Sequence, residues 1–336
     1  MLPVAELHMH IEGSLEAELV VALARRNGVE LPTFDADELK ARYRFTDLQS
    51  FLDIYYANLA VMKTEDDFYD LGTAYLTRAA AAGVRRAEMF FDLQTHTQNG
   101  VAQEAVFAGL TAAIADAKTA TGISADLILC FLRNLGGEAA TRTLREALPF
   151  RDRFIGVGLD SSELGFPPSL FTEAFGIAGS EGLHRVAHAG EEGGPDYVWE
   201  ALDLLGVERI DHGNRAMEDP ELVARLRDEQ IPLTVCPLSN LALKTAPPEL
   251  ADHLLPAMMA EGLLVSINSD DPAYFGGYVD DNFEAIRRQF NLDLDQMATL
   301  ARNSFTASFL PDDEKLAHLA EVNEHLERMR RLTSGA

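Results

Sequence analysis

Four short groups of polar residues stand where apolar runs stop, and together they could bind a metal ion and move protons. They are Glu6-Leu-His-Met-His-Ile-Glu-Gly13, His188-Ala-Gly-Glu191, Asp211-His-Gly213 and Ser269-Asp-Asp-Pro272. Alternate residues of a β-strand face the same side, so His8 and His10 would offer two imidazoles to one ion. A third histidine and a carboxylate from other strand ends would leave one position open for water, which is the layout of a catalytic metal site.

Each group also has a structural explanation when it is taken alone. His188 or His212 could be a hydrogen-bonded residue of a buried core, and Asp270 with Asp271 could cap a helix or form a turn. The occurrence of all four groups at the ends of different apolar runs favours one shared metal site. The other histidines lack such partners and are interpreted as surface or scaffold residues: His96, His184, His253, His318 and His325.

Length and composition limit the classes of protein that fit the chain. Its 336 residues are 47% hydrophobic, which suits a globular protein with a large core, and its net charge is -26. That charge argues against nucleic-acid binding, which needs a basic surface. The N-terminus has no basic, apolar leader, and no run is long enough to span a membrane. Cys130 and Cys236 lie in apolar runs and are expected to be reduced, so a cytoplasmic protein is predicted.

Short apolar runs alternate with amphipathic stretches along the whole chain. Strands are predicted at 3–9, 84–91, 124–132, 154–160, 184–189, 208–212, 231–236 and 263–269. Helices are predicted between them near 15–27, 102–120, 137–147, 168–181, 196–205, 219–229 and 249–261. Eight strands that are each followed by helix predict an α/β fold, the (β/α)8 TIM barrel, with an open doubly wound sheet as the alternative. The barrel is favoured because the candidate ligands end the first, fifth, sixth and eighth strands, which meet at one mouth.

Residues 1–336 are predicted to form a single domain with additions to the barrel. The segment 35–82 is a helical insertion after the first strand, with helices near 47–62 and 65–82. It is interpreted either as extra helix covering the core or as a lid over the barrel mouth. Three further helices are expected near 279–290, 294–308 and 313–331.

On these motifs the chain resembles the adenosine/adenine deaminase family of the metal-dependent amidohydrolase superfamily over nearly its full length. The resemblance implies one Zn2+ per chain, held by His8, His10, His188 and Asp270. It also implies that Glu191 is the general acid, that His212 positions the attacking water, and that Asp271 hydrogen-bonds the purine substrate.

The chemistry of deamination suits these residue types. Zinc can lower the pKa of water to about 7 and so supply a nucleophile. A protonated Glu191 could donate to ring N1, a general-acid role commonly worth about 10²- to 10⁴-fold in rate. The adduct at C6 would then expel ammonia.

Two motifs separate the subgroups of the family. Nucleoside-type members resemble Asp-Leu-Ala-Gly-Asp-Glu after the fourth strand, whereas this chain reads Gly-Leu-Asp-Ser-Ser-Glu at 158–163. That departure, together with Phe90-Phe-Asp92, resembles the adenine deaminase subgroup. Glu163 is therefore predicted to accept a ring N–H of the free base, or else to be a solvated loop carboxylate.

The resulting expectation is zinc-dependent deamination of adenine to hypoxanthine and ammonia in purine salvage. The alternatives are deamination of adenosine or of N6-substituted adenines, a barrel metallohydrolase of esters or amides, and a non-enzymatic scaffold role. The predicted partner is a small purine, with no nucleic acid and no membrane, and the sequence carries no signal for oligomeric state.

Overall fold

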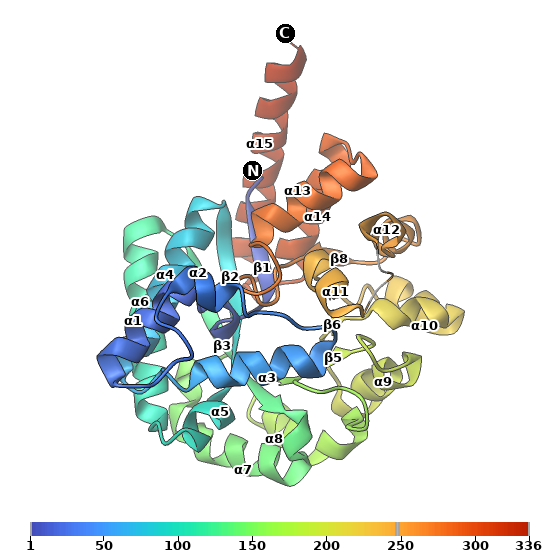
Figure 1. Ribbon diagram of the computed structural model, residues 1–336. Helices are drawn as coiled ribbons and strands as arrows, with labels where there is room; N and C mark the ends of the chain where they lie inside the picture. The colour runs from blue at the N-terminus through green and yellow to red at the C-terminus, as the bar shows by residue number, and fades with distance from the viewer. Residues whose placement is uncertain (1, 246, 248, 335–336) are drawn as a thin grey trace.

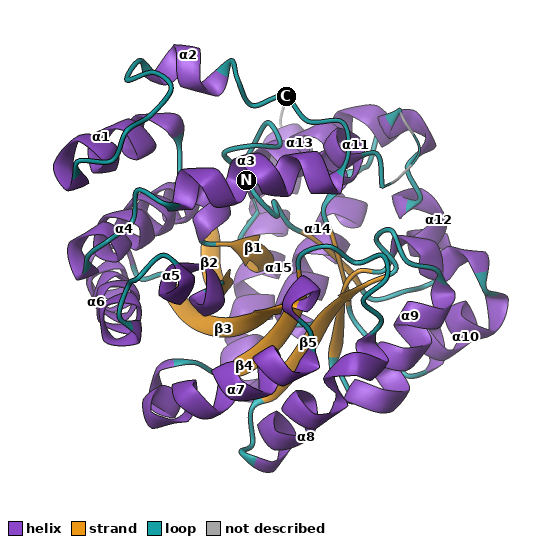
Figure 2. Ribbon diagram, turned by 60° about the horizontal axis from the view of Figure 1, so that its bottom comes forward, coloured by secondary structure: helices purple, strands orange, loops and turns teal. Residues whose placement is uncertain are grey.

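The computed structural model of the chain describes residues 2–245, 247 and 249–334, and a barrel of parallel strands forms its centre. The eight strands pair in the order β1 to β8, with helices packed around them (Figures 1 and 2). The strands are β1 Val4–His10, β2 Val84–Phe91, β3 Ser124–Leu132, β4 Gly156–Asp160, β5 His184–Ala189, β6 Arg209–His212, β7 Leu233–Val235 and β8 Val265–Ile267. The TIM barrel prediction is confirmed, and each strand overlaps a predicted one.

Helices follow the strands and cover the barrel on its outside, as in other α/β barrels (Figure 2). Those of the first half are α1 Ala17–Asn27, α2 Ala36–Lys40, α3 Leu48–Leu59, α4 Glu65–Ala81, α5 Leu93–Gln98, α6 Gln103–Thr121 and α7 Gly137–Ala147. Those of the second half are α8 Thr172–Ser180, α9 Pro195–Glu200, α10 Pro220–Asp228, α11 Pro237–Leu243, α12 Leu255–Ala260, α13 Val279–Phe290, α14 Leu294–Thr306 and α15 Asp312–Ser334.

The helices depart from the sequence prediction where local chemistry interrupts a long pattern. The helix expected at 249–261 is a 3-10 turn at Leu250–Asp252 followed by α12, because Pro256 can stand only in the first turn of a helix. The short helices α5 and α11 were not predicted, since six or seven residues show too little periodicity.

The barrel closes between its first and last strands just beyond the end of β8. The backbone N–H of His10 donates to the carbonyl of Asp270 at 2.9 Å, and the N–H of Asp270 donates to the carbonyl of His8 at 3.0 Å. The side-chain oxygen of Asn268 accepts from the N–H groups of Leu7 and His8 at 2.8 and 3.2 Å. A side chain thus takes over the strand pairing that β8 is too short to provide.

The insertion after β1 places α3 across the mouth of the barrel, at the carboxyl ends of the strands (Figure 2). The helix begins at an Asp47 cap, whose side chain accepts from the N–H of Ser50 at 2.9 Å. Its buried face carries Phe51, Leu52 and Tyr55. The structure supports the covering role of 35–82, and movement as a lid stays a prediction.

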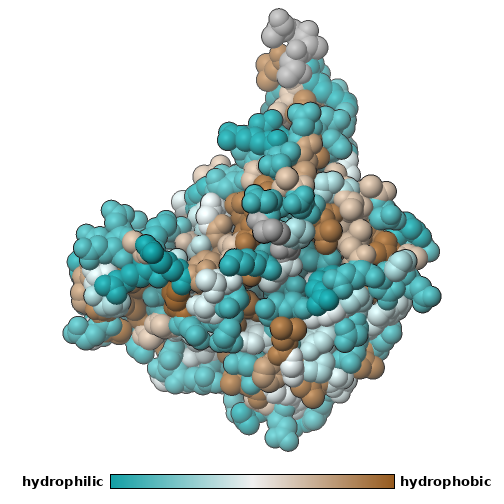
Figure 3. Space-filling view, turned by 45° about the vertical axis from the view of Figure 1, so that its right-hand side comes forward, coloured by the Kyte–Doolittle hydropathy of each residue, from teal (hydrophilic) through white to brown (hydrophobic). Residues whose placement is uncertain are grey.

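The outer surface is mostly polar, with scattered apolar side chains, and α15 projects from the body (Figure 3). Within the part of the chain that the structure describes, every helix is too short or too polar to cross a lipid bilayer.

A buried ion pair crosses the barrel interior below the mouth. Arg209 on β6 donates to the Glu88 carboxylate on β2 at 2.6 Å and to the carbonyl of Leu7 on β1 at 3.1 Å, and both charged side chains are fully buried. Burial raises the pKa of Glu88, but the charges of Arg209 and Arg86 outweigh this effect and leave its pKa below the usual range.

Arg209→Met should lower the free energy of unfolding by about 3–5 kcal/mol, because it leaves a buried carboxylate without its main counter-charge. The loss should shrink as the pH falls through the lowered pKa of Glu88, since a protonated carboxyl group needs no counter-charge. Urea denaturation across pH measures both effects. Arg145→Met, which breaks the exposed pair with Glu173, is the control and should cost at most about 1 kcal/mol. Equal losses in the two variants would contradict the structural role given to Arg209.

Candidate active site

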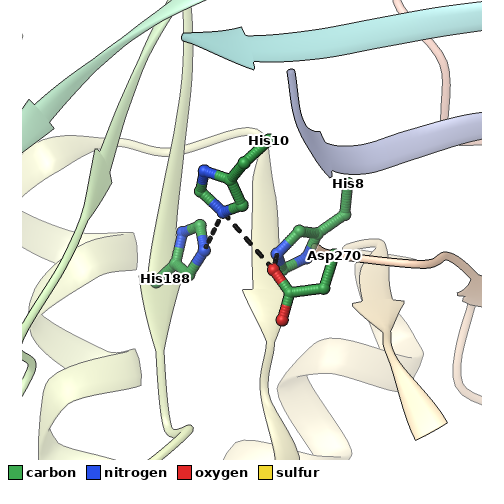
Figure 4. Close-up of side chains that lie close together, drawn as sticks. All are labelled: His8, His10, His188 and Asp270. Atoms are coloured by element: carbon green, nitrogen blue, oxygen red, sulfur yellow. Dashed lines mark hydrogen bonds and ion pairs between the residues drawn. The ribbon is translucent and has the colours of Figure 1, made fainter. Parts of the chain in front are cut away.

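Three histidines and one aspartate converge at the mouth of the barrel (Figure 4). His8 and His10 come from β1, His188 from β5, and Asp270 from the bridge that closes the barrel. The Asp270 Oδ1 atom lies 3.2 Å from His8 Nε2 and 3.4 Å from His10 Nε2. The Nε2 atoms of His10 and His188 are 3.2 Å apart. The ligand set predicted from the sequence is therefore brought together.

The hydrogen bonds of His8 show that its ligand atom is free to bind a cation. The hydroxyl of Thr234 donates to Asp211 at 2.8 Å, so it accepts from His8 Nδ1 at 2.9 Å. The Nε2 lone pair of the neutral imidazole then faces the Asp270 carboxylate with no hydrogen-bond partner. Two acceptors facing each other in a buried place need a positive charge between them, which either a metal ion or a proton on His8 would supply.

The other two histidines have a carboxylate behind the ring at longer range, and Nδ1 of His188 has no hydrogen-bond partner among the described residues. Asp160 lies 3.5 Å from His10 Nδ1 and Asp211 lies 3.6 Å from His188 Nδ1, which leaves each Nε2 directed at the centre. Carboxylates behind metal-binding histidines fix the ring and its tautomer in this way. Burial lowers the pKa of His188 well below its usual range, so this ligand is neutral. Two ligand atoms that each lie about 2 Å from one ion are about 3 Å apart, so the observed spacings fit a metal such as zinc.

Glu191 and His212 lie beside this cluster. The Nε2 atom of His212 is 3.7 Å from Glu191 Oε2 and 3.8 Å from Asp270 Oδ2. Burial, followed by the charge of Asp270, raises the pKa of Glu191 well above its usual range, so this group is a protonated acid near neutral pH. Burial lowers the pKa of His212 to about 3, so its imidazole is neutral. Asn240 contacts Nδ1 of His212 at 3.3 Å through its amide nitrogen, which assigns the ring proton to Nε2.

Asp271 approaches the backbone of the loop after β1 and faces the cavity. A Cβ atom at Gly13 would stand 2.0 Å from its Oδ1 atom, so only glycine permits this approach. Burial and the charge of Asp270 raise the pKa of Asp271 well above its usual range. A protonated Asp271 can donate a hydrogen bond to a ring nitrogen of a bound heterocycle.

These side chains line one cavity between the strand ends and α3. Helix α3 supplies its apolar and aromatic wall, from Leu48, Phe51, Leu52, Tyr55 and Tyr56. The opposite wall is polar and includes two aspartates that sequence reasoning did not select, Asp92 and Asp160. Both stand at a strand end, which is the signal that identified His188 and His212. An apolar wall facing a few converging polar groups is typical of a site for a small flat ligand.

Glu163 makes different contacts from the predicted ones. Its carboxylate is fully buried beneath the loop after β5 and accepts from four consecutive backbone N–H groups, those of residues 190–193, at 2.6–3.0 Å. It does not line the cavity. The prediction that Glu163 accepts a base N–H is therefore corrected, and its contacts make it a positioning residue that holds the loop bearing Glu191.

Glu163→Ala should lower the free energy of unfolding by at least about 2 kcal/mol, because four buried N–H donors lose their acceptor. Hydrogen exchange at the amides of 190–193 should become at least about tenfold faster, since these bonds no longer hold the loop closed. Glu192→Ala is the control, because it changes a side chain of the same loop and leaves the four bonds in place. Unchanged exchange at 190–193 in Glu163→Ala would show that the loop is held by other contacts.

Comparison with known proteins places the chain among deaminases. It is 58% identical to an adenine deaminase of Streptomyces coelicolor over 96% of each chain. The crystal structure of an adenine deaminase from Arthrobacter aurescens matches with a TM-score of 0.95 at 54% identity, covering 97% of this chain and 100% of that one. A cog1816 amidohydrolase from Burkhoderia ambifaria, with bound Zn, matches with a TM-score of 0.91 at 29% identity over 100% and 93% of the two chains. The family model described as adenosine deaminase matches residues 3–325, and the chain belongs to that family.

Proposed function

We propose that this protein hydrolyses adenine to hypoxanthine and ammonia, in the cytoplasm and as part of purine salvage. The observation that carries the proposal is the meeting of a metal-ligand cluster, a protonated carboxyl group and a neutral imidazole in one cavity. The similarity to enzymes named adenine deaminase at 54–58% identity supports adenine as the substrate. The aromatic wall of the cavity, opposite several polar groups, suits a flat heterocycle such as a purine base.

His8, His10, His188 and Asp270 would hold one zinc ion. When bound, zinc supplies Lewis acidity, which makes water a competent nucleophile near neutral pH. Three neutral imidazoles and one carboxylate leave the site with a net positive charge, which preserves that acidity. The crystal structure of the cog1816 amidohydrolase, which is 29% identical to this chain, has bound Zn and supports the choice of metal.

Glu191 would prepare the base for attack at C6. Its protonated carboxyl group donates to ring N1, which draws electrons from C6 and makes that carbon electrophilic. The raised pKa is needed, because an ionised carboxylate has no proton to give at neutral pH. The backbone hydrogen bonds from this loop to Glu163 hold Glu191 in place and so fix where its proton is delivered.

His212 and Asp270 would place the water and receive its proton. The Nε2–H of His212 donates to the water oxygen, while Oδ2 of Asp270, on the same side of the site, accepts a water proton. A carboxyl group must be deprotonated to bind a metal, so a metal-bound Asp270 would be ionised and its Oδ2 atom able to accept the proton. Transfer of that proton to the C6 amino group lets the C–N bond break with loss of ammonia. The new oxygen stays on C6 as the carbonyl group of hypoxanthine, and its remaining proton restores the acid form of Glu191. Asp271 would hold the purine through a ring nitrogen throughout.

His8→Ala and Asp270→Ala should each yield folded protein with at least about tenfold weaker zinc binding, because one of four ligands is lost. Atomic absorption after dialysis against a zinc buffer measures the bound metal, and circular dichroism checks the fold. His184→Ala is the matched control, since His184 lies at the opposite end of β5 and pairs with Glu208. Stoichiometric zinc in either ligand variant would rule out the assigned ligand set.

Zinc-loaded protein should release ammonia from adenine, and Glu191→Gln should slow kcat at least about 10²-fold with zinc still bound. The glutamine keeps the size and hydrogen bonding of the side chain but cannot deliver a proton. In the parent, kcat should fall as the pH rises through the raised pKa of Glu191, because the acid must be protonated to act. A coupled ammonia assay over a panel of adenine, adenosine and N6-methyladenine tests substrate class.

If adenosine released ammonia at the same rate as adenine, the proposal that adenine is the specific substrate would be wrong. No release from any purine in zinc-loaded protein would refute the proposed function itself. Turnover by Glu191→Gln near the parent rate would show that the acid is another group.

A further inference from the structure

Two buried carboxyl groups in the cavity have no part in the steps above. Asp92 follows β2 directly and Asp160 is the last residue of β4, and each is only 2% exposed. One oxygen of each lies within 4.8 Å of the other and of a ring nitrogen of His10. The Oδ1 atoms of both have no hydrogen-bond partner among the described residues, although both side chains line the cavity.

A buried carboxyl oxygen without a donor carries a free-energy penalty of about 1–3 kcal/mol or more. A protonated Asp92 can donate to Asp160, so the two groups partly satisfy each other. A ligand group is needed by the oxygens that still face the cavity. The nearby hydroxyl of Tyr56 does not fill this role, because it donates to Ser161 at 3.1 Å. The ligand must therefore bring a hydrogen-bond donor to this side of the cavity.

Free adenine has a ring N–H donor on this edge, whereas adenosine has only the hydroxyl groups of its ribose, which stand further from the ring. The imidazole ring of the free base carries an N–H at N9, and in a nucleoside that nitrogen is bonded to the sugar. Glu191 is assigned to N1, and Asp271 is placed on N7 in this proposal, so the N3–N9 edge is the part of the base that still lacks a partner.

We infer that Asp160, with Asp92 beside it, accepts the N9–H of the free base and thereby selects adenine over adenosine. This inference rests on the proposed function and names the groups that set its substrate specificity. A sugar at N9 would remove the ring N–H and put its carbon atoms where these carboxyl oxygens would otherwise accept that N–H. A site built to hydrogen-bond a substrate N–H can discriminate by about 10⁴- to 10⁵-fold, whereas an apolar wall gives about 10- to 200-fold.

Asp160 has a second contact that defines the competing explanation. Its Oδ2 atom lies 3.5 Å from Nδ1 of His10, so it also orients a metal ligand. If orientation were its only role, substitution would weaken zinc binding and slow all substrates alike. If Asp160 binds the base, its substitution changes the ratio of the dissociation constants of two ligands, one that has the N9–H and one that lacks it.

The test compares the binding of adenine with that of 9-methyladenine, which lacks the N9–H. Calorimetry on zinc-loaded Glu191→Gln protein gives both dissociation constants without turnover. We expect this background to favour adenine by at least about 10²-fold. Adding Asp160→Leu, which keeps bulk and removes the acceptor, should weaken adenine binding and narrow the ratio at least about tenfold, and Asp160→Ala and Asp92→Ala should also narrow it.

Asp116→Asn on α6 is the control, because Asp116 is hydrogen-bonded to Tyr69 at the surface. Its ratio of the two dissociation constants should equal that of the Glu191→Gln protein alone. An unchanged ratio in both Asp160→Leu and Asp160→Ala would overturn the inference, whether or not zinc is lost. Retained adenine affinity in Asp160→Leu with a changed ratio in Asp160→Ala would also overturn it, by reducing Asp160 to a steric wall. Neither result would affect the proposed function, which fails only if the parent protein does not deaminate adenine.

Discussion

The backbone hydrogen bonds between His8, His10 and Asp270 are the constraint on which the rest of the site depends. They close the barrel, because β8 itself ends at Ile267 and only an isolated bridge joins its continuation to β1. The same bonds set the spacing of three of the four proposed metal ligands. Asp270 adopts a left-handed backbone with φ of +65°, which is unfavourable for a residue other than glycine. The fold and the metal site therefore stabilise each other, and the strain at Asp270 is offset by barrel closure.

The crowding of carboxyl groups in the cavity is a second constraint on the site. The carboxyl groups of Asp92, Asp160, Asp270, Asp271 and Glu191 all line one buried space. Such groups cannot all be ionised without cations, so their pKa values must separate. Asp270, beside the histidines, is the ionised one, while burial and its charge keep Glu191 and Asp271 protonated. One ionised ligand thus creates both the base and the acids that deamination needs.

The sequence predicted the barrel and the meeting of the candidate ligands at its mouth, because both follow from one regular pattern, an apolar strand ending in a polar residue. The assignment of Glu163 failed because sequence order does not show where a side chain points. Glu163 lies three residues beyond β4 and turns back under the loop of Glu191. Asp160 ends the strand itself and so faces the mouth. Similarly, the positive φ of Ser161 and His212 could not be expected from residues that rarely adopt it.

The placement of these carboxylates separates the chemistry from the choice of substrate. Aligned on its last residue, the nucleoside-type motif Asp-Leu-Ala-Gly-Asp-Glu puts its glutamate at Glu163, its glycine at Ser161 and its alanine at Asp160. A glutamate common to both motifs fits a part that both reactions need, which is the support of the acid loop after β5. The change from alanine to aspartate falls instead on β4, where the structure leaves a buried oxygen without a partner. Because β4 and β5 supply these groups independently, substitution at one strand end can change the ligand that is selected while the proton donor at the other stays in place.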